Sequence, residues 1–299
     1  MNMHLELIVK EPLVRGGLAL YPLFSSSPAA PAYVTGPEAE RAGALRVAEK
    51  PGDASVPELM VHNLGALPLL LVEGETLVGT KQNRTINASV LVPAGAATTI
   101  GVSCVEAGRW GAPQESYRSA RHSPPDLRRV NAAATDHLRQ SEVWSRITRY
   151  EEDLGAASST AALEDAFAAR GDDVAALVAG TRPLPEQRGV AVAVGGVLRG
   201  LDCFDKPETL AAYWDGLCAG YALDAVATAP DGDIAPSELP TIAQVEALIA
   251  CVLTATPAGG TAPTGLGAGR TFTGTGVVGR VLEWKGAVVH VSAFVEETA

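Results

Sequence analysis

Residues 188–202 read RGVAVAVGGVLRGLD, and this short stretch decides which fold class the sequence predicts. Two runs of small and β-branched residues flank the pair Gly195-Gly196, which is typical of a β-hairpin with a tight turn. Segments with helical patterns precede and follow the hairpin, so strands do not alternate singly with helices along the chain. The sequence therefore predicts an α+β fold in preference to a doubly wound α/β fold.

Strand-like segments begin and end the chain, and the helical segments lie between them. Strands are expected at 5–24, 57–63, 67–73, 85–92, 98–105, 270–274, 277–284 and 287–295. A long helix is expected from Asp126 to Leu154, with further helices near 160–170, 172–180, 207–222 and 240–255. We expect one α+β domain, residues 1–299, in which N- and C-terminal strands build a mixed or antiparallel sheet around a helical middle section at about 126–182.

The composition of the chain excludes several classes of protein. Its 299 residues are 47% hydrophobic, which is too apolar for a disordered chain and enough for a sizeable core. A net charge of −11 argues against broad nucleic-acid binding. No apolar run approaches the ~20 residues of a membrane span, and Met1 leads into a strand-like run without a secretory signal. We therefore expect a cytoplasmic protein with reduced cysteines and with neither membrane nor nucleic acid as a partner.

Positive charge is concentrated in one part of this acidic chain. Residues 109–149 hold eight arginines and four acidic residues, a local net charge of +4. Arginine binds phosphate and carboxylate groups through its planar fork, so this segment suits a small anionic ligand. We expect at least one of Arg118, Arg121, Arg128 and Arg129 to reach such a ligand. The alternative is a solvated helix face with ion pairs one turn apart.

The densest polar stretch is EGETLVGTKQNR, residues 73–84, which directly follows the apolar run 67–72. Apolar strands end in such groups when a site binds or reacts with a polar molecule. A second polar stretch, CVEAGRW at 104–110, follows the expected strand 98–105. If the two strand ends are neighbours, their carboxylates, cations and amides converge in one cleft beside the flat ring of Trp110.

Each residue type in these stretches suggests a role. Glu75 is the first choice for a general base and Glu106 the second, while Lys81 would stabilise developing negative charge. The expected ligand-binding residues are Glu73, Gln82, Asn83, Arg84, Asn87, Cys104, Arg109, Trp110, Arg121 and Arg128. Paired carboxylates can also hold Mg²⁺, although no close spacing of cysteines and histidines marks a metal site.

A purely structural interpretation of the same residues stays open. Ion pairs such as Glu75 with Arg84 would close the ends of hairpins without any ligand. His290 alternates with valines in the last expected strand, and we interpret it as a core or rim histidine, not as a catalyst.

The polar motifs resemble those of a known family. Glu73-Gly74-Glu75, Gly79-x-Lys81-Gln82-Asn83-Arg84-x-x-Asn87 and Cys104-x-Glu106-x-Gly108-Arg109-Trp110 are similar to motifs of the ARG and rhodanese-phosphatase-superfamily-associated protein domain. The resemblance runs over most of the chain and includes Gln140-x-x-Val143-Trp144, Leu201-Asp202-x-Phe204 and Val289-His290-x-Ser292-Ala293-Phe294. The family name implies association with ADP-ribosylglycohydrolases and with rhodanese- or phosphatase-like proteins. It implies a context of NAD or ADP-ribose metabolism but no particular reaction.

Three functions are consistent with these patterns. The first is a hydrolase, of the glycohydrolase or phosphohydrolase type, that acts on an NAD- or ADP-ribose-derived nucleotide. The second is a nucleotide-sensing module, in which the same polar residues bind without catalysis. The third is a structural or interaction protein whose polar cluster belongs to its fold. The first two predict a small phosphorylated nucleotide as ligand, and the resemblance implies ADP-ribosylglycohydrolase-type proteins as partners.

Overall fold

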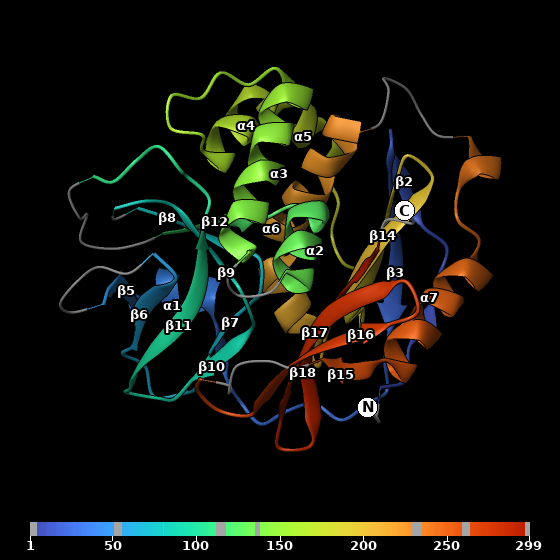
Figure 1. The fold of residues 1–299 in the computed structure, drawn as a ribbon. Coiled ribbons are helices and arrows are strands. Elements are labelled where there is room, and N and C mark those ends of the chain that lie inside the picture. Colours follow the sequence, from blue (N-terminus) through green and yellow to red (C-terminus); the bar gives the residue numbers. More distant parts are fainter. Residues whose placement is uncertain are drawn as a thin grey trace.

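The computed structural model describes residues 5–50, 56–79, 81–111, 118–134, 138–228, 235–258 and 264–296. Within these ranges the protein has an α+β fold, as the order of its segments predicts. Two β parts lie side by side, with helices between and around them (Figure 1). The larger β part contains the N- and C-terminal strands, and the smaller contains strands from the first half of the chain.

The expected hairpin is the centre of the larger sheet. Its strands are β13 (Gly189–Val194) and β14 (Val197–Phe204), which pair antiparallel. β13 pairs on its other side with β3 (Leu18–Phe24), and β14 pairs with β18 (Ala287–Val295). The N- and C-terminal strands therefore share one sheet, as expected, but the hairpin separates them.

The other strands of this sheet lie outside these four. The order is β1-β3-β13-β14-β18-β17-β16-β15, and β2 pairs with β3. The bounds are β1 (Ile8–Val9), β2 (Leu13–Arg15), β15 (Thr256–Ala258), β16 (Ala268–Gly274) and β17 (Val277–Trp284). Lys285 and Gly286 join β17 to β18 and both have positive φ, which makes the tight turn that the sequence predicts.

The smaller β part has two sheets that share an apolar core. Six strands lie in the order β12-β8-β9-β11-β6-β5, and three lie in the order β10-β7-β4. Their bounds are β4 (Val34–Thr35), β5 (Leu45–Glu49), β6 (Glu58–Asn63), β7 (Leu69–Leu71), β8 (Glu75–Val78), β9 (Arg84–Ile86), β10 (Val90–Val92), β11 (Ala97–Cys104) and β12 (Arg118–His122). The expected strand 85–92 is thus two strands, because the chain passes from one sheet to the other between Ile86 and Val90.

Helices fill the space between the two β parts and cover the far face of the larger sheet (Figure 1). The bounds are α1 (Gly36–Arg41), α2 (Pro125–Ala133), α3 (Arg139–Leu154), α4 (Leu163–Ala169), α5 (Gly171–Val178), α6 (Pro207–Thr228) and α7 (Ile242–Thr254), with a 3₁₀ turn at Pro236–Glu238. The central helix α6 contacts β12 of the smaller part and β13 of the larger, whereas α7 packs on β16 and β17. Within the described ranges, none of the helices combines the length and the apolarity that crossing a membrane requires.

The long helix expected from Asp126 to Leu154 is two helices. α2 ends at Ala133, and Ala134 has extended backbone angles, with φ −68° and ψ 141°. α2 then packs against β17 and β18, whereas α3 packs against β11 and α4. Apart from their contacts with each other and with α6, the two helices pack on different elements. Their apolar faces continue the same spacing, so the sequence pattern alone does not reveal the break.

Asp224 on α6 is a buried carboxylate at the contact between α6 and α3. The hydroxyl of Tyr150 donates to its Oδ1, and the backbone nitrogen of Asp126 donates to its Oδ2 at 3.1 Å. Burial is the main cause that raises the pKa of Asp224 from its ordinary 3.8 to about 7, and the negative charge of Asp126 adds to the rise. The hydrogen bonds and the charge of Arg199 oppose it.

We predict that Asp224 makes the protein less stable as the pH rises. The pKa of Asp224 is raised in the folded state. Its contribution to the free energy of unfolding is therefore complete below its ordinary pKa of 3.8 and is lost as the pH rises through about 7. The free energy of unfolding of the wild type, relative to Asp224→Asn, should therefore fall by up to ~1.4 kcal/mol per pH unit across this window. Urea denaturation at several pH values measures the difference. Asp215→Asn, at an exposed position of the same helix, leaves Asp224 in place and should keep the pH dependence of the wild type.

Candidate functional site

The structure divides the expected site residues among separate groups and does not bring them into one cleft. The main cause is Gly74, whose φ of +83° turns the chain between Glu73 and Glu75. The two carboxylates therefore have different surroundings, instead of sharing one face of a strand. The expected meeting of strand ends occurs between Asn83 and Glu106, where the Asn83 backbone nitrogen donates to Glu106 Oε2 at 3.0 Å.

The first group is buried where the two β parts meet, and we call it the Arg128 network. Its members are Glu73, Ser89, Arg128, Asp202, Tyr221 and His290. Arg128 on α2 donates to Glu73 Oε2 from Nε at 3.0 Å and from Nη2 at 2.7 Å. It donates to Asp202 on β14 from Nη1 at 2.9 Å and from Nη2 at 2.6 Å. One guanidinium thus joins a turn of the smaller part to the centre of the larger sheet.

The charges of this network fix the protonation state of Asp202. Burial alone would raise the pKa of Asp202, but the charge of Arg128 and the hydrogen bonds from Arg128 and His290 outweigh it. The pKa of Asp202 therefore lies well below its usual value, and the group is a carboxylate. Tyr221 donates to its Oδ2 at 2.5 Å. Burial and the neighbouring negative charge of Asp202 raise the pKa of Tyr221 well above its ordinary value, so Tyr221 remains a donor.

His290 and Ser89 close the network into a ring. His290 Nε2 lies 3.2 Å from Asp202 Oδ1, and His290 Nδ1 lies 2.7 Å from Ser89 Oγ. The backbone nitrogen of Glu73 donates to Ser89 Oγ at 2.9 Å, which returns to the residue that binds Arg128. His290 is buried, as interpreted from its place among valines, and both of its ring nitrogens lie within hydrogen-bond distance of a partner.

The second group, the Glu106 group, lies where β9 and β11 end. Its members are Gln82, Asn83, Glu106, Arg109 and Thr160. Arg109 donates from Nε to Glu106 Oε1 at 2.7 Å and from Nη2 to Asn83 Oδ1 at 3.1 Å. The hydroxyl of Thr160 donates to Glu106 Oε1 at 3.2 Å. Both oxygens of this carboxylate are therefore occupied.

The third group, the Trp110 group, consists of Lys81, Arg84 and Trp110. The Trp110 side chain is half exposed. Lys81 Nζ lies 4.8 Å from its ring centroid, and the Arg84 guanidinium carbon lies 6.0 Å from it. Arg84 is fully buried, and among the described residues its donors reach backbone carbonyls, those of Val56 at 3.1 Å and Asn83 at 3.3 Å. Its Nη2 has no hydrogen-bond partner within the described part of the chain.

Glu75 belongs to none of these groups. It is buried beside Gly36, where a β-carbon would lie 2.9 Å from Glu75 Oε1 and 3.3 Å from the Tyr213 hydroxyl. It pairs across the sheet with His122, whose two ring nitrogens have no hydrogen-bond partner among the described residues. Burial lowers the pKa of His122 to about 3, with a further contribution from the charge of Arg128, so this ring is neutral at neutral pH.

Three expected ligand-binding residues have structural partners. Asn87 accepts from Ser103 and Asn131, and the backbone of Cys104 exchanges two hydrogen bonds with Gln140. Arg121 pairs with Glu164 on α4 at 3.1 Å and lies over the ring of Phe167. At least one of four arginines is expected to reach the cleft. Among them, Arg128 contacts a predicted site residue, Glu73, while Arg129 pairs with Asp126. The Arg118 side chain lies outside the part that the structure describes.

Comparison with known proteins identifies the family. A model of the ARG and Rhodanese-Phosphatase-superfamily-associated Protein domain matches residues 6–294. The chain belongs to this family. No curated protein and no solved structure matches it. The match extends over all three groups, so the resemblance predicted from the two polar motifs is confirmed for nearly the whole chain.

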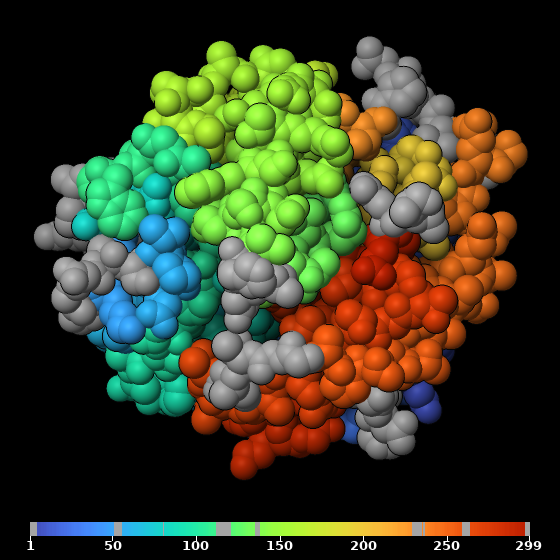
Figure 2. Space-filling view, viewed as in Figure 1, coloured from blue at the N-terminus to red at the C-terminus, as the bar shows by residue number. Residues whose placement is uncertain are grey.

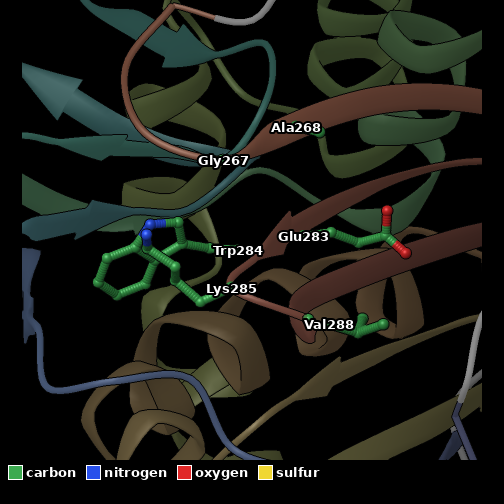
Figure 3. A pocket seen from close by; sticks show the side chains of 7 residues that line it. Gly267, Ala268, Glu283, Trp284, Lys285 and Val288 are labelled. Atoms are coloured by element: carbon green, nitrogen blue, oxygen red, sulfur yellow. The ribbon is translucent and has the colours of Figure 1, made fainter.

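Two surface hollows in the described part of this family member lie outside the three groups. One of about 380 Å³ is lined by Gly267, Ala268, Glu283, Trp284, Lys285, Gly286 and Val288. Figure 3 shows its carboxylate, Glu283, directed away from Trp284 and Lys285, and Glu283 pairs with Arg270. A second hollow, of about 300 Å³, contains Asp126, which is already paired with Arg129 and Arg146.

The residues that sequence reasoning missed are single polar residues inside apolar strands and helices. Asp202 lies in the hairpin strand β14, and Tyr221 lies on the almost wholly buried helix α6. Ser89 precedes the apolar strand β10. A carboxylate in a buried strand is itself a signal, because it must find a donor or a cation. No group of three or more potential ligands within the described ranges is arranged to hold a metal ion.

We predict that Arg128 is indispensable for stability. Arg128→Met leaves Glu73 and Asp202 buried without their cation, and breaking such a pair costs ~3–5 kcal/mol. Arg129→Met, one residue along α2, removes a partly exposed pair with Asp126 and no buried carboxylate contact of the Arg128 network, so it should cost less, ~1 kcal/mol. Urea denaturation of both variants measures the two losses. Similar losses in the two variants would contradict the importance assigned to the Arg128 network.

Proposed function

We propose that this protein binds a phosphorylated nucleotide of the NAD or ADP-ribose kind at the Trp110 group. The observation that carries the proposal is the state of Arg84. Its guanidinium is fully buried, it contacts carbonyl oxygens but no carboxylate among the described residues, and its Nη2 is unpaired. A buried cation without a counter-ion is costly, and an anion that pairs with it removes part of that cost.

The neighbours of Arg84 favour a phosphate that carries an aromatic base. Lys81 supplies a second, half-buried cation near the same ring. Trp110 supplies a half-exposed flat surface on which an adenine or nicotinamide ring can stack. Membership in the family supports this ligand class through the ADP-ribosylglycohydrolase context that its name implies. A cytoplasmic location, as predicted from the sequence, would give the protein access to such nucleotides.

We predict that Arg84→Met separates ligand binding from folding. The apolar side chain removes an unpaired buried charge, so the free protein should be as stable as the wild type or more stable. Its affinity for ADP-ribose or NAD should fall at least about tenfold, which corresponds to ~1.4 kcal/mol. Thermal melts with and without each nucleotide, and with and without Mg²⁺, measure both quantities, since a ligand of the native state raises its stability.

A lysine outside the Trp110 group provides a matched control. Lys206 lies 3.8 Å from the ring centroid of Tyr33, so Lys206→Ala removes a lysine from a similar aromatic contact. This variant should keep the wild-type response to nucleotides, whereas Lys81→Ala and Trp110→Ala should weaken it. If neither ADP-ribose nor NAD stabilises the wild type at millimolar concentration, the proposed ligand is wrong.

Hydrolysis of the bound nucleotide is the second candidate function, and the position of Glu106 favours it. Its carboxylate accepts from the backbone of Asn83, whose carbonyl accepts from Arg84 Nη1 at 3.3 Å. Asn83 therefore contacts both the Glu106 carboxylate and Arg84, the centre of the proposed phosphate site. Glu75 instead lies against Gly36. A water molecule that replaced the 3.2 Å bond from Thr160 would be placed for general-base activation by Glu106.

If the protein is a hydrolase, Glu106→Gln should lower kcat by about 10²–10⁴-fold, because the base is lost. Nucleotide-induced stabilisation should remain, because the amide keeps the size of the side chain. Product release from ADP-ribose and NAD, followed by chromatography, measures the rate. Equal losses in Glu75→Gln and Glu106→Gln would contradict the choice of Glu106. A wild type that binds nucleotide and releases no product over hours would favour the sensing function instead.

A further inference from the structure

We propose that Ser89 is the nucleophile of a second site, which cleaves carboxylic esters with His290 as the general base. The observation is the chain of hydrogen bonds from Asp202 through His290 to Ser89 inside the Arg128 network. A nucleophile within reach of a base, with the base oriented by a third group, is the arrangement that recurs in covalent hydrolases on unrelated folds. This site shares no residue with the Trp110 group, so the proposal stands independently of nucleotide binding.

The charge state of Asp202 determines how the imidazole is oriented. Asp202 is a carboxylate, held so by Arg128, and a carboxylate can only accept hydrogen bonds. An imidazole with one proton at this position therefore carries that proton on Nε2, which donates to Asp202 Oδ1 at 3.2 Å. The lone pair of Nδ1 then faces Ser89 Oγ at 2.7 Å and accepts its proton. The base is in the tautomer that activating a serine requires.

The surroundings of Ser89 suit an attacking oxygen. The Glu73 backbone nitrogen donates to Ser89 Oγ at 2.9 Å, which fixes the rotamer of the hydroxyl. Asp202 and His290 are each about 1% exposed, whereas Ser89 is only half buried and follows exposed Ala88. The chain of bonds thus runs from the interior to the one member that solvent and a substrate can reach.

The excess negative charge of the network favours proton transfer to His290. Glu73 and Asp202 carry two negative charges against the single positive charge of Arg128, and Glu73 Oε1 has no partner among the described residues. When His290 takes the proton of Ser89, the positive charges of Arg128 and His290 balance the two carboxylates. A positive imidazole is therefore stabilised in the buried site at the moment when the nucleophile forms.

The reaction is balanced with these groups and water alone. Ser89 Oγ bonds to the ester carbonyl carbon while its proton passes to His290 Nδ1, and the carbon–oxygen bond to the alcohol breaks as that alcohol takes the proton. Water then attacks the acyl-serine, its proton passes to Nδ1, and the bond to Ser89 Oγ breaks. Ser89 regains its proton, and the products are a carboxylic acid and an alcohol. The substrate class is an uncharged or weakly charged ester small enough to approach Ala88 and Ser89.

A serine-directed fluorophosphonate tests the nucleophile on the wild-type protein. Attack by Ser89 would displace fluoride and leave a covalent adduct, which peptide mass spectrometry assigns to a residue. We expect the adduct on Ser89 of the folded protein, and we expect it to be absent from Ser89 in His290→Gln. Ser103→Ala removes a neighbouring buried hydroxyl that donates to Asn87, and it should label at the wild-type rate. Labelling of other residues only, or equal labelling of Ser89 in His290→Gln, would overturn the proposal.

Ester hydrolysis provides the second measurement. Ser89→Ala should lower the rate of p-nitrophenyl acetate hydrolysis at least about 100-fold in protein that is still folded by its melting curve. Ser103→Ala should retain the wild-type rate. An unchanged rate in Ser89→Ala, or wild-type protein that is folded by its melting curve and hydrolyses no ester above the buffer rate, would show that the hydroxyl serves only the fold. Nucleotide binding at the Trp110 group, measured on the same samples, would be unaffected by either result.

Discussion

The contact of Arg128 with Glu73 and Asp202 is the constraint on which the joining of the two β parts depends. The three side chains come from helix α2, from the turn before β8 and from the centre of the larger sheet, and all three are buried. Removing such charges from water costs several kcal/mol for each, so they are tolerated only in a geometry that satisfies them together. The planar guanidinium has five donors and can hold both carboxylates at once, which a lysine cannot do. This one side chain thereby adds a polar contact between the two β parts, whose apolar residues pack in a shared core cluster.

The buried charge also determines which polar side chains surround it. Two carboxylates share one guanidinium, and two further side chains contact one of them: Tyr221 and His290 both reach Asp202. The close approach of the two β parts also needs small residues on the central helix, since a β-carbon at Gly220 would lie 2.7 Å from the carbonyl oxygen of His122. The largely apolar interior between the two β parts thus contains a buried polar network and is tightly packed around it. Ser89 is the half-buried member of the Arg128 network and lies at the boundary of this interior.

The fold class could be predicted from the sequence, whereas the partners of the site residues could not. A glycine pair between valine-rich runs predicts a hairpin from local chemistry alone, and the strands β13 and β14 are where this pattern places them. The polar stretch 73–84 was likewise visible. The partners of its residues could not be predicted, because Arg128 lies 55 residues from Glu73 and 74 from Asp202 in the sequence. No local pattern indicates which strands become neighbours. The turn at Gly74 also separates Glu73 from Glu75, so these two carboxylates of one motif have different partners.

The contrast between two buried arginines separates what the fold requires from what a ligand would require. Arg128 and Arg84 are both removed from solvent, but Arg128 has two carboxylates and Arg84 has only carbonyl oxygens within the described ranges. Folding alone explains the first, because its charge is satisfied and three elements meet on it. Folding does not explain the second, because an apolar side chain of similar size would fill the same space without the cost of burying a charge. Residues that lower stability without a structural return are expected where a protein binds or reacts with something. The unsatisfied arginine beside Trp110 is therefore a stronger indication of a ligand than the larger and better-bonded network at the centre of the molecule.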